Sequence, residues 1–131
     1  MKVIDSSTLV KFFSKEKGWE KVTEIISEGV ATLDLAIKEI ASALWKKVIR
    51  EEMDESVAIR ILSDLLKKEA IITVNQDEYL VEAFKIATKY KITVYDALFI
   101  ALAKSMKTEL ITSDKKQYDA SLKEGIKSQF I

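Results

Sequence analysis

Lys2-Val3-Ile4-Asp5-Ser6-Ser7 is the stretch that indicates the fold of this chain. A short apolar run follows Met1 and ends at an acid and two hydroxyl residues, which is typical of a buried strand that leads into a helix. Asp5 would therefore stand at the carboxyl end of that strand. Ligands of open parallel α/β sheets bind outside the carboxyl ends of the strands. This position makes Asp5 a candidate for chemistry as well as for packing.

The same alternation of strand and helix patterns continues along the chain. Short runs rich in apolar and β-branched residues predict further strands at 30–33, 71–74, 109–112 and 126–130, of which 71–74 is either a strand or a short extended connector. Amphipathic spacing predicts a helix over 77–90, and the almost wholly apolar segment 95–106 predicts a buried helix. The alternation favours one domain over residues 1–131, a three-layer α/β/α sandwich with a mainly parallel sheet of four to five strands.

The composition excludes several classes of protein. Hydrophobic residues make up 48% and charged residues 32% of the 131 residues, which is typical of a globular domain. The chain has no Cys and no His, which excludes disulfides, thiolate nucleophiles, Ser-His-Asp triads and ordinary zinc sites. No glycine-rich phosphate loop is present. Because we find neither a membrane-spanning segment nor a signal peptide, we expect a cytoplasmic protein with no membrane partner.

Four acids occupy related positions in this pattern. Asp5, Asp96 and Asp114 each follow an apolar run or open the helix after it, and Glu39 lies in the first two turns of a helix. Since the carboxyl ends of parallel strands meet at one edge, we expect all four acids at the same rim. Converging carboxylates repel one another, and a divalent cation relieves the repulsion. Oxygen ligands alone favour Mg²⁺ or Mn²⁺, and metal-assisted phosphodiester hydrolysis is the natural reaction.

Each acid also has a purely structural interpretation. Asp is a preferred helix N-cap, and an acid in the first turn is stabilised by the helix dipole. Glu39 taken alone is an ordinary solvated helix residue. The spacing of the four acids does not decide between these interpretations.

Four longer stretches resemble the PIN-domain family of nucleases, and within it the VapC-type toxins of VapBC toxin–antitoxin pairs. They are VIDSSTLVKFF around Asp5, AIKEIASALWKKV around Glu39, TVYDALFIALAK around Asp96 and LITSDKKQY around Asp114. The resemblance runs over essentially the whole chain and in the same order. It implies an α/β sandwich with Mg²⁺- or Mn²⁺-dependent endoribonuclease activity, in which these four acids form the catalytic and metal-binding quartet.

The resemblance also implies supporting residues around the acids. Ser7 and Thr112 match hydroxyl residues that help to hold the metal site, whereas Ser6 and Ser113 fit a helix cap as well as a site residue.

Lys115 follows Asp114 directly and, with Lys116, is expected to contact RNA phosphates, although the net charge of zero gives no overall attraction to RNA. A charged, solvated surface is the alternative for both lysines.

The expected partners are an RNA substrate, a cognate antitoxin and a second copy of the chain. The helices near Phe12, Phe13, Trp19 and Val22 carry more hydrophobic surface than one thin layer of the fold needs. This excess suggests a groove or a dimer contact. VapC-like proteins commonly form homodimers and are inhibited by an antitoxin segment that covers such a groove.

Two other functions fit the same pattern. One is a non-catalytic RNA-binding or assembly module that keeps the carboxylates. The other is a flavodoxin-like signalling domain with a phosphoacceptor acid, which would carry two neighbouring acids at the first strand. We rank the signalling domain last because Asp5 stands alone there.

Overall fold

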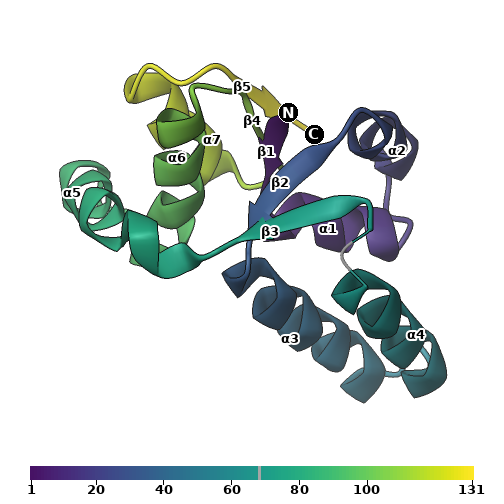
Figure 1. The fold of residues 1–131 in the computed structure, drawn as a ribbon. Coiled ribbons are helices and arrows are strands. Elements are labelled where there is room, and N and C mark those ends of the chain that lie inside the picture. The colour runs from purple at the N-terminus through teal and green to yellow at the C-terminus, as the bar shows by residue number, and fades with distance from the viewer. Residues whose placement is uncertain (68) are drawn as a thin grey trace.

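Five parallel strands form the centre of the molecule. The computed structural model describes residues 1–67 and 69–131. The strands are β1 (Lys2–Ile4), β2 (Val30–Leu33), β3 (Ile71–Val74), β4 (Leu110–Thr112) and β5 (Ser128–Phe130). They are arranged in the order β3-β2-β1-β4-β5, and each neighbouring pair is parallel (Figure 1). The predicted parallel sheet is confirmed, with 71–74 a true strand and β5 at an edge.

Helices fill every connection between the strands. They are α1 (Ser6–Phe13), α2 (Trp19–Ser27), α3 (Leu35–Ile49), α4 (Glu55–Leu66), α5 (Leu80–Tyr90), α6 (Val94–Met106) and α7 (Lys115–Lys123), with a 3₁₀ turn η1 (Gln76–Tyr79) before α5. Helices α1 to α4 lie on one side of the sheet and α5 to α7 on the other (Figure 1). This arrangement is the predicted α/β/α sandwich.

The direction in which successive strands are added to the sheet reverses between β1 and β4. The second and third strands extend the sheet on one side of β1, and the last two extend it on the other. Asp5 follows β1 and Asp114 caps the helix after β4, so both stand where the strand order reverses. Ligands of doubly wound sheets bind outside the carboxyl ends of the strands at this kind of switch point.

Helix α6 forms the centre of the core, as the apolar pattern of 95–106 predicts. Seven consecutive residues, 97–103, are buried, and the helix packs against β1, β2 and β4. Three of these seven residues, Ala97, Ala101 and Ala103, are small, which lets the helix lie close to the sheet. Because its first turn points to the carboxyl ends of the strands, Asp96 is delivered to the same rim as Asp5. No helix in the two described segments is long and apolar enough to cross a membrane.

Two predicted boundaries are wrong by a few residues. The helix predicted over 77–90 begins as η1, because the Asn75 side chain accepts a hydrogen bond of 2.9 Å from the Asp77 N–H and starts a tight turn. Ile126 lies outside β5 because its N–H donates to the Ser121 carbonyl at the end of α7, at 2.9 Å. Neither difference changes the layer order.

Candidate active site

The four predicted acids line one cleft at the carboxyl ends of β1 and β4. The cleft has a volume of about 490 Å³, and its lining includes Asp5, Glu39, Asp96 and Asp114 together with Ser6, Ser7 and Ser113. These residues come from four separate parts of the sequence. The parallel sheet and the layer order bring them together, as the strand pattern predicts.

Asp5 is both a helix cap and the most buried acid of the cleft, with 2% of its surface exposed. Its Oδ1 accepts a hydrogen bond of 2.9 Å from the Thr8 N–H. Its Oδ2 accepts from the hydroxyls of Ser7 and Thr112, at 2.7 and 2.6 Å. Burial raises the pKa of Asp5, and these hydrogen bonds oppose the increase. Asp5 therefore caps helix α1 and at the same time lines the cleft with the other acids.

Asp96 and Asp114 stand at the first turns of α6 and α7. The Asp114 carboxylate caps α7 by accepting from the Gln117 N–H at 3.0 Å. Partial burial raises the pKa of Asp96, and the negative charges of Asp114 and Asp5 raise it further, while Lys116 lowers it. The two helix starts therefore bring like charges close enough to interact.

Glu39 belongs to the same electrostatic group although it lies on α3. The Ser6 hydroxyl donates to its Oε1 at 2.9 Å, which ties the side chain to the start of α1. Partial burial raises the pKa of Glu39, and the charges of Asp96 and Asp5 add to the increase. Glu39 is therefore not the solvated helix residue of the structural interpretation.

Hydroxyl groups join the ends of β1 and β4 beneath the acids. The Thr112 hydroxyl donates to Asp5 and accepts from the Asp114 N–H at 3.0 Å. The Ser7 hydroxyl donates to Asp5 and accepts from the Ser113 N–H at 3.1 Å. Ser7 and Thr112 thus contact the first acid directly and fix its position relative to the loop that carries Asp114.

Gln117 is a cleft residue that the sequence pattern did not single out. Its side chain is 1% exposed, and its Nε2 donates to the Asp96 carbonyl at 2.9 Å, which links α7 to the first turn of α6. Its Oε1 is buried and has no hydrogen-bond partner among the described residues. The available signal was its place three residues after Asp114, on the face of α7 that turns toward the sheet.

The two lysines expected to contact RNA lie beside the cleft. Lys115 forms an ion pair of 3.2 Å with Asp119, and its Nζ lies 5.2 Å from the ring centre of Tyr118. Lys116 is exposed and close enough to Asp96 to lower its pKa. Both lysines are exposed and line a groove together with Asp96 and Asp114.

The donor atoms of the cleft suit a hard divalent cation. Carboxylate and hydroxyl oxygens are the groups that Mg²⁺ and Mn²⁺ prefer. Burial raises the pKa of Asp5, Glu39 and Asp96, and repulsion by neighbouring acids adds to the increase for Glu39 and Asp96. Within 1–67 and 69–131, no group of three acids is already arranged as a metal cluster. The cleft therefore has the right chemistry, and the carboxylates would have to draw together, or act through water, to hold an ion.

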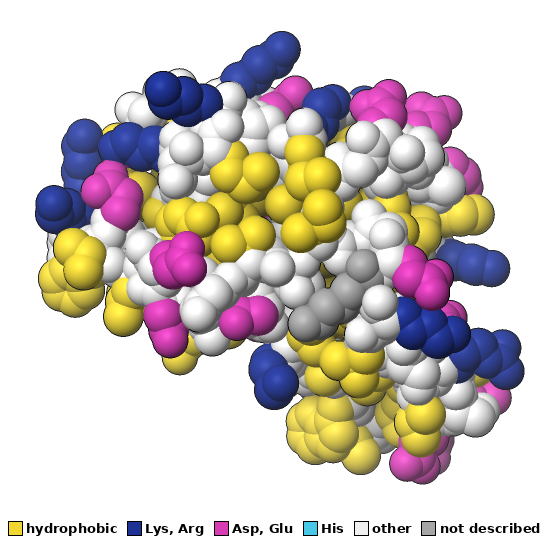
Figure 2. Space-filling view, viewed as in Figure 1, with side chains coloured by type: hydrophobic (Ala, Val, Ile, Leu, Met, Phe, Trp, Pro, Cys, Tyr) yellow, Lys and Arg dark blue, Asp and Glu magenta, His cyan; other side chains and the backbone are white. Residues whose placement is uncertain are grey.

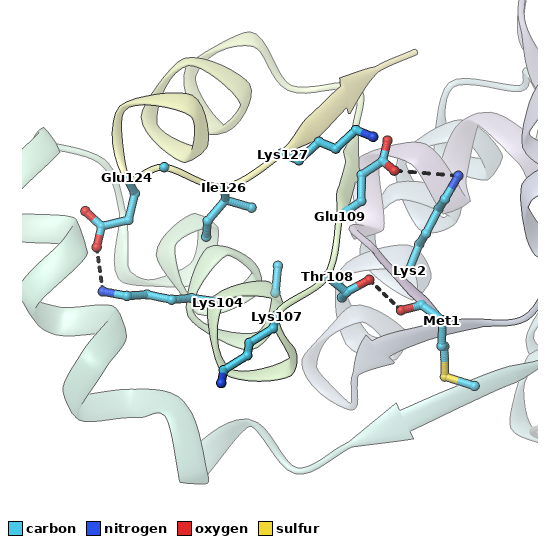
Figure 3. A pocket seen from close by; sticks show the side chains of 11 residues that line it. Met1, Lys2, Lys104, Lys107, Thr108, Glu109, Glu124, Ile126 and Lys127 are labelled. Atoms are coloured by element: carbon cyan, nitrogen blue, oxygen red, sulfur yellow. Dashed lines mark hydrogen bonds and ion pairs between the residues drawn. The ribbon is translucent and has the colours of Figure 1, made fainter.

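A larger cavity of about 640 Å³ lies at the opposite edge of the sheet (Figure 3). Each of its two acids is paired with a lysine, since Glu109 meets Lys2 at 3.7 Å and Glu124 meets Lys104 at 2.7 Å. The Thr108 hydroxyl donates to the Met1 carbonyl at 2.7 Å. These pairings leave no converging acids there, so the catalytic candidate is the smaller cleft at the carboxyl ends.

The family model described as PIN domain matches residues 2–123, almost the whole chain. The chain belongs to the PIN-domain family. Ribonuclease VapC3 of Pyrobaculum aerophilum is 33% identical over 117 residues, which are 87% of this chain and 89% of that protein. Exonuclease VapC9 of the same organism is 29% identical over 114 residues, covering 87% and 80%. The resemblance to VapC proteins is thereby confirmed.

Solved structures confirm the PIN-like fold. PAE2754 from Pyrobaculum aerophilum matches with a TM-score of 0.75 at 25% identity, over 97% of this chain and 82% of that chain. A toxin–antitoxin complex from Klebsiella pneumoniae contains a chain that matches with a TM-score of 0.65 at 19% identity, over 90% of each chain. The flavodoxin-like signalling alternative is not supported by these matches.

Proposed function

We propose that this PIN-domain protein is a Mg²⁺- or Mn²⁺-dependent endoribonuclease that hydrolyses RNA phosphodiester bonds. The observation that carries the proposal is the meeting of Asp5, Glu39, Asp96 and Asp114 in one cleft. Burial raises the pKa of three of these acids, and neighbouring charge raises it further for Glu39 and Asp96. Such an arrangement costs stability unless a cation or a proton offsets the repulsion. The ribonuclease relative supports RNA as the substrate.

The four acids would hold the ion, and the remaining cleft residues would keep the acids in place. When bound, the ion makes water a better nucleophile and neutralises charge on the scissile phosphate. Thr112 and Ser7 hold Asp5 by the hydrogen bonds described above, and Ser6 holds the Glu39 carboxylate toward the cleft. Glu39 would complete the set of ligands or orient the attacking water by accepting its hydrogen bond.

The proposal includes an antitoxin as protein partner. An apolar pocket of about 230 Å³ lies between α1, α2, α4 and β3, and its lining includes Phe12, Phe13, Ile26 and Leu65. It would receive an apolar segment of the antitoxin. The toxin–antitoxin complex among the structural neighbours supports such a partner. Val22, which the sequence pattern assigned to this surface, is fully buried and belongs to the core instead.

We also propose that the chain forms a homodimer. Figure 2 shows hydrophobic side chains gathered over β3 and over the α3–α4 pair. On α3, Trp45 and Ile49 are 59% and 63% exposed, and Ile72 of β3 is 49% exposed. Exposed apolar side chains of this size lose contact with water when a second copy covers them. Sedimentation of the purified chain, compared with Trp45→Glu, tests this part of the proposal.

Cleavage of a pool of structured RNAs with Mg²⁺, with Mn²⁺ and with EDTA tests the nuclease. We expect products only with metal, and a loss of at least about 100-fold for Asp96→Asn, the scale on which one positioned charge affects a rate. Asp77→Asn is the control, because Asp77 is an exposed acid outside the cleft. A covalently closed circular RNA must also be cleaved if the enzyme is an endonuclease. RNA binding without cleavage under any of these conditions would favour the non-catalytic module.

A further inference from the structure

The carboxylate cleft continues into a separate groove on each side. One groove shares Glu39 and Ala43 with the cleft, and the other shares Asp96 and Asp114. The acids therefore lie between the two grooves, in the middle of a longer depression. The side chains that line the two outer parts differ in charge from those of the centre.

The groove on the Glu39 side follows helix α3. It has a volume of about 340 Å³, and its basic lining residues are Lys46, Lys47 and Arg50. Positions 39, 43, 46 and 50 recur at helical spacing, so they form one stripe along the helix. At 1.5 Å of rise per residue, the stripe runs about 16 Å away from Glu39. Opposing acids are Glu52 in the groove and Glu16, which is 4.0 Å from Lys47.

The groove on the other side begins at Asp96 and Asp114. It has a volume of about 470 Å³, and its basic lining residues are Lys91, Lys115 and Lys116. All three are exposed. Among the residues that the structure describes, Lys115 is the member of this set that forms an ion pair, with Asp119 at 3.2 Å. The two grooves thus place three cations on each side of a central group of acids, although the whole chain has no net charge.

We propose that a single RNA strand crosses the whole depression, with backbone phosphates held by Lys46, Lys47 and Arg50 on one side and by Lys91, Lys115 and Lys116 on the other. This inference rests on the proposed function. The central acids repel phosphates in the absence of a cation, so the affinity for RNA must come from the flanking cations. A strand that continues into both grooves has no free end at the acids. The path therefore predicts endonucleolytic rather than exonucleolytic cleavage.

Salt-dependent binding of RNA measures the contribution of each groove. The probe is a fluorescein-labelled oligouridine of about 12 nucleotides, followed by fluorescence anisotropy in EDTA over a range of salt concentrations. One triple variant carries Lys46→Gln, Lys47→Gln and Arg50→Gln, and a second carries Lys91→Gln, Lys115→Gln and Lys116→Gln. The control triple, Lys21→Gln, Lys85→Gln and Lys123→Gln, removes the same charge from exposed positions that line neither the cleft nor the two grooves.

Each groove variant is expected to reduce the slope of log K against log salt by about 2, since each phosphate contact on a single strand contributes about 0.7. The control triple is expected to keep the slope of the parent. The corresponding Lys→Arg variants of the two grooves, with Arg50→Lys, keep the charge and should bind as the parent does. Circular dichroism of every variant checks that the chain is folded.

Three results would overturn the proposed path. The first is a slope of log K against log salt that is the same in the parent and in every variant. The second is an equal loss of slope in the groove triples and the control triple. The third is a loss of slope in one groove triple alone, which would place a strand end at the acids. Failure of the proposed function gives a different result. In that case the parent fails to cleave RNA with metal, while the two groove triples still lose affinity in EDTA.

Discussion

At the scale of single residues, two buried side chains set the positions of the acids. The Thr112 hydroxyl lies between Asp5 and Asp114, donating to the carboxylate of the first and accepting from the N–H of the second. Gln117 joins the helix that begins after Asp114 to the carbonyl of Asp96. Neither residue carries a charge, yet together they contact three of the four acids.

Replacing Thr112 by Val should weaken metal binding as well as folding. The substitution keeps the shape of the side chain, but it leaves the Asp114 N–H without its acceptor and removes one donor from Asp5. We expect a loss of about 1–3 kcal/mol in the free energy of unfolding and about 10–100-fold weaker Mn²⁺ binding. Urea denaturation and a calorimetric Mn²⁺ titration measure the two effects. Thr32→Val is the matched control, because Thr32 is equally buried but donates to the Ile4 carbonyl.

In that control, stability should fall while Mn²⁺ affinity stays within about 2-fold, since no carboxylate loses a partner. An equal loss of Mn²⁺ affinity in both variants would show that Thr112 acts only through general stability.

Replacing Gln117 by Met should separate stability from metal binding. Met has nearly the same length and flexibility, removes the bond to the Asp96 carbonyl and also removes the buried, unpartnered Oε1. These two effects on stability oppose each other, so we expect the thermal midpoint to change by less than about 3 °C. Mn²⁺ affinity should fall by about 10-fold, because the first turn of α6 loses its link to α7. Ser121→Ala, at a buried position farther along α7, should leave Mn²⁺ affinity unchanged.

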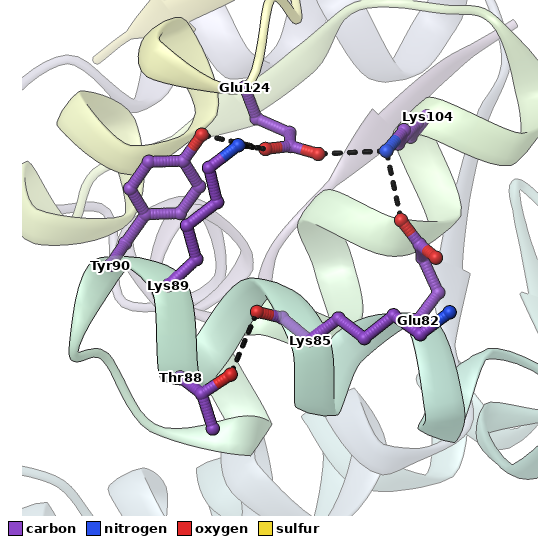
Figure 4. Close-up of polar contacts among 7 residues, drawn as sticks. All are labelled: Glu82, Lys85, Thr88, Lys89, Tyr90, Lys104 and Glu124. Atoms are coloured by element: carbon purple, nitrogen blue, oxygen red, sulfur yellow. Dashed lines mark hydrogen bonds and ion pairs between the residues drawn. The ribbon is translucent and has the colours of Figure 1, made fainter.

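At the scale of elements, an ion-pair network holds the ends of α5, α6 and α7 together (Figure 4). Lys104 of α6 meets Glu82 of α5 at 2.8 Å and Glu124, just after α7, at 2.7 Å. The Tyr90 hydroxyl also donates to Glu124 at 2.6 Å. Hydrogen bonds to the two acids raise the pKa of Lys104, and the bond from Lys104 lowers the pKa of Glu124. Lys104 and Glu124 lie near the carboxyl ends of α6 and α7, so the network joins these two helices at the ends away from Asp96 and Asp114.

Lys104→Met should therefore destabilise the protein more than the loss of an isolated surface ion pair would. Glu124 has a side chain only 10% exposed, so loss of its principal partner leaves a poorly solvated carboxylate. We expect a decrease of about 1 kcal/mol in the free energy of unfolding, measured in urea, and smaller in high salt. Lys67→Met is the control, because Lys67 and Asp64 are both about 60% exposed and their pair should contribute almost nothing. Equal effects of the two substitutions would contradict the special role of Glu124.

At the scale of the whole molecule, the cleft makes stability depend on pH. Asp5, Glu39 and Asp96 have raised pKa values in the folded state, so the folded protein holds these protons more tightly than the unfolded chain does. Their contribution is therefore most favourable below the ordinary values of 3.8 and 4.5, and it is lost as pH rises through those values toward the raised ones. Glu124, with a lowered pKa, acts in the opposite direction.

Thermal unfolding without metal should reveal this dependence when the parent is compared with Asp96→Asn. As pH rises from about 4 to about 8, the parent should lose stability relative to the variant, because only the parent acquires the repelling Asp96 charge. Mg²⁺ at pH 8 should stabilise the parent more than the variant, since an ion that binds only the folded state raises the thermal midpoint. A difference between the two proteins that does not change with pH would show that the acids do not interact.

The alternation of strands and helices, and with it the parallel sheet and the common edge of the acids, follows from the sequence alone. Periodicity of apolar residues is local information, and a parallel sheet leaves few ways to connect such elements. The stretches around Asp5, Glu39, Asp96 and Asp114 also indicated the family, which the comparisons confirm. The starts of β5 and α5 were misplaced, because turn hydrogen bonds decide such boundaries.

Only the tertiary structure decided that Gln117 supports the acids and that Val22 belongs to the core. Gln117 reads as an ordinary helix residue until α6 is packed against α7, and Val22 reads as surface until α2 is packed on β2. The sequence indicated Lys115 and Lys116 beside Asp114, but not that Lys91 lines the same groove or that Lys46, Lys47 and Arg50 line a groove beside Glu39. Sequence periodicity reports which face of an element is apolar, whereas contacts and charge clusters depend on distances between elements that only packing fixes.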